Sequence, residues 1–388
     1  MAEQNRVTQH APTGVNGLNG LDLLALKELF EVSYLATPRF FFAPGWVDLM
    51  GSTTLDVGGW SLSMPVDRGV VVAAVPRHDR RIQVRLLMEG GLETLDLDDP
   101  QAIPADHWLG ILLRVVHDLE MRQVNFSGAD IVIASNLPPG IEWQDMTALA
   151  EALSLTFYEL AGANVTGCSG SALGGQAWLK NQLTGTLLPV ALGLSDLALV
   201  LCDSRVQPGL ISTLAPQRKL EAGYGLDLLH LVQPDWQCWD DVDSRLLQVG
   251  QCGLEDEIIL KRMRHCVSEN ARVQPMAEAL RSGNAKMVEA LWQSSLLSWQ
   301  QDFEFTCLEW DTLAKLAGTL PGVVGSRVLT GGDFEGCTLH WVYPSVLGAF
   351  EAEVSERYES VFGCLPYISL MQPGMVAQEL WVVEPVTV

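Results

Sequence analysis

Residues 41–68 constrain the fold most, because two apolar runs enclose a polar, glycine-containing loop there. The segment reads FFAPGWVDLMGSTTLDVGGWSLSMPVDR. We expect a buried strand that breaks at Pro44-Gly45, a turn at Gly58-Gly59 and a second strand that ends at Asp67-Arg68. A loop held between two strands by proline and glycine is a good place to present side chains to a ligand. The segment is therefore the first candidate for a functional site.

The rest of the chain shows helical and strand periods in mixed order. Helices are expected at residues 21–34, 107–121 and about 144–160, and throughout most of the second half as far as residue 318. Strands are expected at residues 40–42, 69–75, 81–87, 92–97, 129–134 and 197–202. The polar residues 1–20 are expected to form a disordered tail.

A length of 388 residues favours two domains over one core. We place the crossing between them around residues 206–215, which gives an N-terminal domain of residues 21–205 and a C-terminal domain of residues 206–388. The formal net charge of −23 argues against nucleic acid and anionic membranes as partners, because their phosphates would be repelled.

The eight cysteines include no CxxC pair and no spacing typical of a zinc site. No N-terminal run resembles a signal peptide, and no apolar stretch reaches the length of a membrane span. These features predict a cytoplasmic protein with reduced cysteines and no bound metal.

The segment 41–68 resembles the signature of the galactokinases, which belong to the GHMP superfamily of small-molecule kinases. In that family it reads roughly APGRVNLIGEHTDYNGG, followed by a strand and an Asp-Arg pair. Three later segments resemble family patterns in the same order: residues 262–273 (RMRHCVSENARV), 297–307 (LSWQQDFEFTC) and 325–338 (GSRVLTGGDFEGCT).

The resemblance implies an α+β fold, namely the two-domain GHMP kinase fold with the ligand cleft between the domains. It also implies that MgATP and a sugar would meet in that cleft. His265, inside the segment 262–273, is expected to pack in the core.

The family holds the triphosphate in a loop of the type G-L-S-S-S-A at the start of a helix, where backbone N–H groups and the helix dipole meet the phosphates. The positions matched by the resemblance carry acidic or bulky side chains instead of serines. They are Gly140, Glu142, Trp143, Gln144, Asp145 and Met146. A carboxylate repels phosphate, and Asp145 by itself is also interpretable as a plain helix cap. The family's magnesium ligands fall near Met146 and Ala150, beside Glu151.

The positions for sugar recognition have also changed. The family's E-H-T-D stands here as Ser52, Thr53, Thr54 and Leu55, so the sugar-binding aspartate is missing and Asp56 is displaced by one place. Losing an acceptor for sugar hydroxyls costs several kcal/mol of binding, on the order of 1–3 kcal/mol for each unpaired group.

The catalytic pair of the family is absent as well. Its arginine falls at Trp46, which carries no charge to stabilise a developing phosphate. Its aspartate falls at Gly175, and no acidic residue occurs between Leu160 and Ser195 in any register.

A further glycine-rich run continues the pattern at Gly331, Gly332 and Asp333. Asp333 and Glu335 replace family glycines. Taken singly, each is interpretable as an ordinary solvated loop carboxylate. Taken together, the acidic replacements fall repeatedly on loops that face phosphate in the family.

Two functions from different classes follow. The first is a galactokinase-like protein that has lost kinase activity and acts as a binding or regulatory module, with no cofactor and with an unknown small molecule or protein as partner. The second is an active ATP-dependent kinase with an altered substrate and a base recruited elsewhere, at Asp56 or Asp203. A third alternative is a non-nucleotide metabolite bound in the same cleft.

Overall fold

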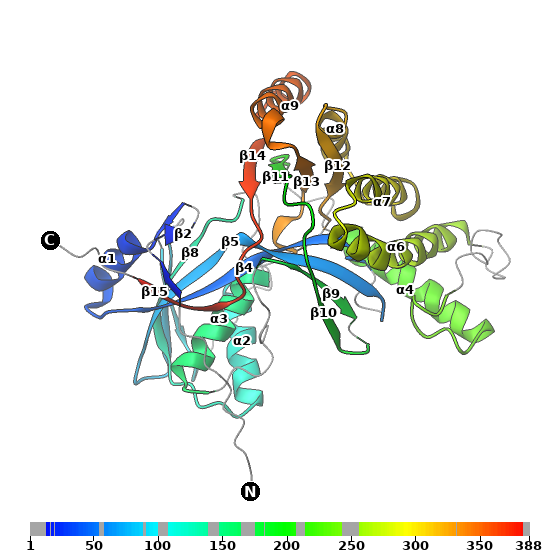
Figure 1. Cartoon of the computed structure of the whole chain (residues 1–388). Helices are drawn as coiled ribbons and strands as arrows, with labels where there is room; N and C mark the ends of the chain where they lie inside the picture. Colours follow the sequence, from blue (N-terminus) through cyan, green and yellow to red (C-terminus); the bar gives the residue numbers. More distant parts are fainter. Residues whose placement is uncertain are drawn as a thin grey trace, which may run out of the picture.

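The computed structural model describes residues 13–15, 17–18, 20–53, 58–87, 91–99, 108–138, 147–163, 175–181, 183–206, 214–242, 256–330 and 332–382. Within them two sheets and their helices form the α+β architecture expected from the sequence (Figure 1). None of the helices in these ranges combines the length and apolarity that crossing a membrane requires.

Nine of the described strands form the first sheet. Along its main path they are β1 (Thr13–Val15), β15 (Gln378–Val382), β4 (Arg39–Met50), β5 (Trp60–Pro76), β8 (Ala129–Ser135), β6 (Arg81–Leu86) and β7 (Leu92–Asp96). A hairpin of β9 (Ala177–Asn181) and β10 (Thr186–Val190) joins the sheet through β5. The short pair β2 (Gly17–Leu18) and β3 (Leu21–Asp22) lies apart from it.

Helices cover both faces of the first sheet, as the alternation of side chains along β4 requires. Phe40 and Phe42 pack with α1 (Leu23–Tyr34) on one face. Phe41 points to the other face, into the large core that includes α2 (Leu109–Met121) and α3 (Thr147–Leu160). A sheet buried on both faces explains the near-continuous apolar runs in its strands.

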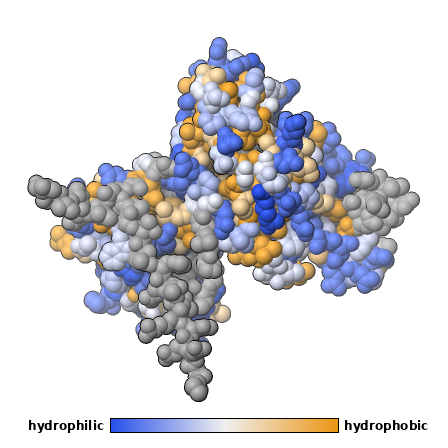
Figure 2. Space-filling view, in the orientation of Figure 1, coloured by the Kyte–Doolittle hydropathy of each residue, from blue (hydrophilic) through white to orange (hydrophobic). Residues whose placement is uncertain are grey.

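The second sheet has the order β12 (Val323–Val328), β13 (Cys337–Val342), β11 (Ala198–Asp203) and β14 (Tyr367–Met371), and neighbouring strands pair antiparallel. The helices after β11 are α4 (Leu214–Val232), α6 (Glu257–Arg281), α7 (Ala285–Ser298), the π-helix η4 (Trp299–Phe303), α8 (Leu308–Gly318) and α9 (Leu347–Phe362). The described residues also include two 3₁₀ turns, η5 (Gly332–Phe334) and η6 (Pro344–Val346). On the face shown in Figure 2 hydrophilic side chains gather over α9 and around α4, with apolar ones scattered between them.

The structure corrects the expected strand limits in the segment 41–68. β4 does not break at Pro44-Gly45 but continues to Met50, and β5 does not end at Asp67-Arg68 but continues to Pro76. The register shifts between Pro44 and Trp46. A bulge of this kind accommodates proline, which has no N–H to donate to the ladder.

The structure bears on the predicted N-terminal tail but not on the predicted domain boundary. Residues 1–12 lie outside the described ranges, but Thr13–Val15 form β1 beside β15, so the expected tail of residues 1–20 is too long. The division after residue 205 stays a prediction. β11 precedes it and pairs within the second sheet, whereas β15 returns from the C-terminal end to the first sheet (Figure 1).

A buried ion network ties the two sheets together at β4. The carboxylate of Glu269 on α6 accepts hydrogen bonds from the Gly51 N–H at 3.3 Å and the Ser295 hydroxyl at 2.8 Å. Arg327 on β12 lies 3.4 Å from the same carboxylate, and its Nε donates to the Asp48 carbonyl at 2.7 Å. Burial alone would raise the pKa of Glu269, but Arg327, Arg272 and His265 outweigh it and hold that pKa at about 2.

Replacing Glu269 with Gln should therefore destabilise the protein strongly, because Arg327 would keep its charge in the interior without a counter-ion. We expect a loss of about 3–5 kcal/mol in the free energy of unfolding, measured by urea denaturation. Glu278→Gln is the matched control, since Glu278 lies on the same helix in an exposed pair with Arg281. A loss below about 1 kcal/mol for Glu269→Gln would contradict the central role of this network.

Candidate functional site

The candidate site lies where the bulge of β4, the first turn of α3 and the turn η5 meet. Asp333 of η5 is buried, with 1% of its surface exposed, and its carboxylate binds backbone N–H groups of both neighbours. One oxygen accepts from Ala148 at 3.0 Å and the other from Trp46 at 3.3 Å. α3 begins at Thr147, so this carboxylate occupies the positive end of the helix.

Burial is the largest influence on Asp333 and raises the pKa of its carboxyl to about 6. The N–H groups of Ala148, Trp46 and Thr147 act in the opposite direction, and the negative Glu151 adds to the increase. The interpretation of Asp333 as a solvated loop carboxylate is therefore wrong. Sequence reasoning could not foresee that the turn after Gly332 folds into the site.

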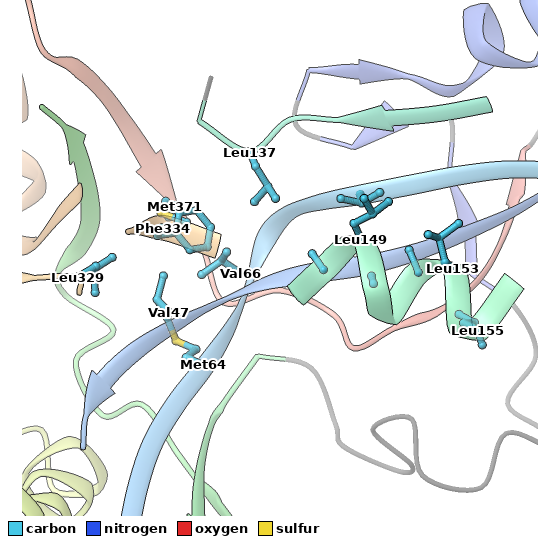
Figure 3. Close-up of a cluster of buried hydrophobic side chains, with 14 of the residues drawn as sticks. Val47, Met64, Val66, Leu137, Leu149, Leu153, Leu155, Leu329, Phe334 and Met371 are labelled. Atoms are coloured by element: carbon cyan, nitrogen blue, oxygen red, sulfur yellow. The ribbon is translucent and has the colours of Figure 1, made fainter. Parts of the chain in front are cut away.

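Phe334 explains why the turn is held so deeply. Its ring lies against Gly45, where a Cβ would stand only 2.7 Å from the ring and 2.8 Å from Leu137. Figure 3 shows Phe334 among apolar side chains of both sheets, including Val66 and Met371. Glycine at position 45 therefore permits the close packing that carries Asp333 to the N-terminus of α3.

Trp46 and its neighbours form the accessible side of the site. The Trp46 indole N–H donates to Glu151 on α3 at 3.3 Å, and the ammonium of Lys180 on β9 lies 4.1 Å from the centre of the indole ring. A cation above an aromatic face is attracted by the ring quadrupole. Trp46 carries no charge itself, so Lys180 supplies a positive charge beside it. Lys180 escaped the sequence analysis because the pairing of β9 with β5 leaves no local signal.

Comparison with known proteins shows which family the chain belongs to. No protein-family model matches it. A galactokinase of Roseiflexus sp. is 30% identical over 370 residues, which are 88% of this chain and 93% of the relative. A galactokinase of Halalkalibacterium halodurans is 27% identical over 385 residues, which are 91% and 95% of the two chains.

The chain belongs to the galactokinase family.

Solved structures agree on the fold. The Lactococcus lactis galactokinase complexed with galactose superposes with a TM-score of 0.84 at 24% identity, covering 92% of this chain and all of that one. The mevalonate kinase of Methanococcus jannaschii gives a TM-score of 0.54 at 12% identity, covering 87% and 99%. The GHMP kinase fold expected from the sequence is confirmed.

Of the predicted galactokinase sugar positions, three are described: Trp46, which lies on the accessible side of the site, Ser52 and Thr53. The Thr53 hydroxyl lies 3.3 Å from Nε2 of His265 and is buried. The Ser52 hydroxyl is buried and forms no hydrogen bond within the described part of the chain. Leu55 and Asp56 lie outside the described residues.

Of the predicted nucleotide positions, Gly332 and Asp333 belong to η5. The others lie outside the described residues: Gly140, Glu142, Trp143, Gln144, Asp145, Met146 and Gly331. Gly175, at the position of the family's catalytic aspartate, has a φ of +82° and donates its N–H to the Gly374 carbonyl at 3.0 Å.

The two remaining candidate residues, His265 and Asp203, are buried in the interior of the protein. His265 is buried as expected, contacts the rings of Trp299 and Phe303, and lies 3.0 Å from the Ser298 hydroxyl. Burial lowers its pKa to about 3. Asp203, considered as a recruited base, lies in β11 opposite Cys337 and accepts the Arg205 N–H at 2.7 Å, while burial raises the pKa of its carboxyl.

Asp333→Asn tests the environment of the buried carboxyl. The pKa of Asp333 rises from 3.8 to about 6 on folding, so its ionisation costs stability as the pH rises through that window. Relative to the variant, the wild type should lose about 2 kcal/mol of unfolding free energy between pH 4 and pH 7, measured by urea unfolding. Glu359→Gln, on the exposed side of α9, should leave the pH profile unchanged. A pH-independent difference between wild type and Asp333→Asn would contradict this assignment.

Proposed function

We propose that this galactokinase-family protein does not transfer phosphate and acts as a binding or regulatory module through its remodelled cleft. The Asp333 carboxylate carries the proposal. It accepts the N–H of Ala148 in the first turn of α3, where the family resemblance places the triphosphate, and the N–H of Trp46 on β4. Backbone N–H groups that already bind an internal anion are not available to bind an external one.

The charges around this helix end support the same conclusion. Glu151 lies close enough to raise the pKa of Asp333, so two acidic groups share the start of α3. A nucleotide triphosphate entering here would meet like charges at short range, which costs several kcal/mol of binding. The aromatic Trp46 at the position of the family's arginine supplies no fixed positive charge against them.

The proposal includes no MgATP as cofactor, no bound metal and no catalytic residue. Its ligand is a small molecule or a protein, and its compartment is the cytoplasm. The alternative is an active sugar or small-molecule kinase that uses MgATP and a recruited base. Asp203, one base considered for it, lies in β11 of the second sheet and accepts the backbone N–H of Arg205.

A thermal-shift experiment with a kinase assay separates the two functions. The wild-type chain should show no change in Tm with MgATP and no phosphorylation of galactose. The Roseiflexus galactokinase should be stabilised by about 2.7 kcal/mol when MgATP reaches 100 times its Kd. Turnover that disappears when Trp46 or Glu151 of this chain is replaced would overturn the proposal in favour of an active kinase.

Asp333→Gly tests the internal anion directly. The change restores a glycine and leaves the N–H groups of Trp46 and Ala148 without their acceptor, so an oxyanion can bind them. We expect millimolar inorganic phosphate to raise the Tm of the variant and to leave that of the wild type unchanged. Equal responses of the two proteins to phosphate would mean that the carboxylate does not occupy an anion site.

A further inference from the structure

One face of the first sheet carries a group of polar side chains next to Trp46. Asp48 on β4 pairs with Ser63 on β5, which pairs in turn with Trp178 on β9. Ser61 and Lys180 form the next cross-strand pair, and alternation along the strands places all five on the same face. Ser61 and Ser63 are buried, so polar groups lie on the interior part of this face.

Within the described part of the chain, Lys180 has no hydrogen-bond acceptor for its ammonium. Its contact is the ring of Trp46, and none of the described residues forms a hydrogen bond or ion pair with it. Burial lowers the pKa of Lys180, and the charges of Asp48 and Glu151 oppose this shift without cancelling it. Other buried cations are paired, as Arg262 is with Glu221 at 2.7 Å. A charge taken partly out of water gains most from a ligand that brings an opposite charge.

The surrounding carboxyl groups limit that ligand. Asp48 and Glu151 both contribute to the potential at Lys180, and Asp333 lies near Glu151. A single negative charge in contact with Lys180 is compensated, because a charge-assisted hydrogen bond is shorter and stronger than a neutral one. A second negative charge meets only like charges. The ring of Trp46 adds a flat apolar surface beside the ammonium.

We propose that Lys180 and Trp46 form a site for a monoanionic small molecule in which a carboxylate is attached to a compact hydroxylated body, as in a hexuronic acid. The carboxylate accepts from Lys180, the body of the ligand packs on the indole of Trp46, and its hydroxyls reach Asp48. This inference rests on the proposed function, because the site is available to such a ligand when no nucleotide uses the cleft.

Calorimetric titration at pH 7 tests the site, with galacturonate and glucuronate as probes. Galactose and galactose 1-phosphate are the neutral and dianionic comparisons. At least one hexuronate should bind the wild type about tenfold or more tightly than either comparison. Lys180→Met should lose that preference, whereas Lys180→Arg should keep most of it. Lys286→Met, which removes an exposed lysine of α7, should behave as the wild type does.

Several results would overturn the site: no binding of either hexuronate, equal binding of galactose, tighter binding of galactose 1-phosphate, or an unchanged preference in Lys180→Met. The unfolding temperature of each variant shows whether it is folded, and Lys180→Arg keeps the test decisive if the methionine variant is not. Turnover of MgATP, measured on the same preparations, reports separately on the proposed function. Kinase activity would refute that function whatever the hexuronates do.

Discussion

The structure depends on one buried carboxylate, that of Glu269, because it holds the second sheet and its helices against β4 of the first. Glu269 faces Arg327 and the Gly51 N–H, and Arg327 reaches across to the Asp48 carbonyl. The indole N–H of Trp292 adds a bond to the Leu49 carbonyl at 3.0 Å. The bonds of Arg327 and Trp292 end on backbone carbonyls of β4, and that of Glu269 ends on Gly51 just after it, so the strand that carries Trp46 and Asp48 is held in place. The candidate site depends on this support, because Asp333 of the turn η5 bonds both to Trp46 on β4 and to Ala148 on α3.

A helix N-terminus needs an anion or a cap, and this chain supplies one from a distant segment. The Asp333 carboxylate satisfies N–H groups at the start of α3 that the family resemblance assigns to phosphate. The raised pKa of Asp333 shows that burial destabilises its carboxylate more than the hydrogen bonds from the backbone N–H groups stabilise it. A side chain kept in such a position contributes little to stability at neutral pH. The arrangement is therefore better understood as occupation of an anion site than as a stabilising contact.

The sequence allowed the fold to be predicted because its signals are local or lie in order along the chain. Strand periods, glycine-rich turns and the order of the segments at residues 41–68, 262–273 and 325–338 sufficed. The charged contacts of the candidate site were harder to predict from the sequence. Asp333 contacts Trp46 although the two residues are 287 positions apart (333 − 46). Lys180 contacts the same residue from 134 positions away (180 − 46). Position 333 resembled a solvated loop because nothing nearby indicates that Phe334 draws it inward.

These long-range contacts also change what the replacement of the family's arginine by Trp46 means. A lost cation taken alone would leave a neutral, weakened site. Here Lys180 on β9 supplies a positive charge beside the ring of Trp46, and Glu151 on α3 accepts the indole N–H. A phosphate transition state needs donors around several oxygens at once. The ammonium of Lys180, with the carboxylates of Asp48 and Glu151 nearby, provides one donor group and a single positive charge. This arrangement suits recognition of a small ligand better than phosphoryl transfer.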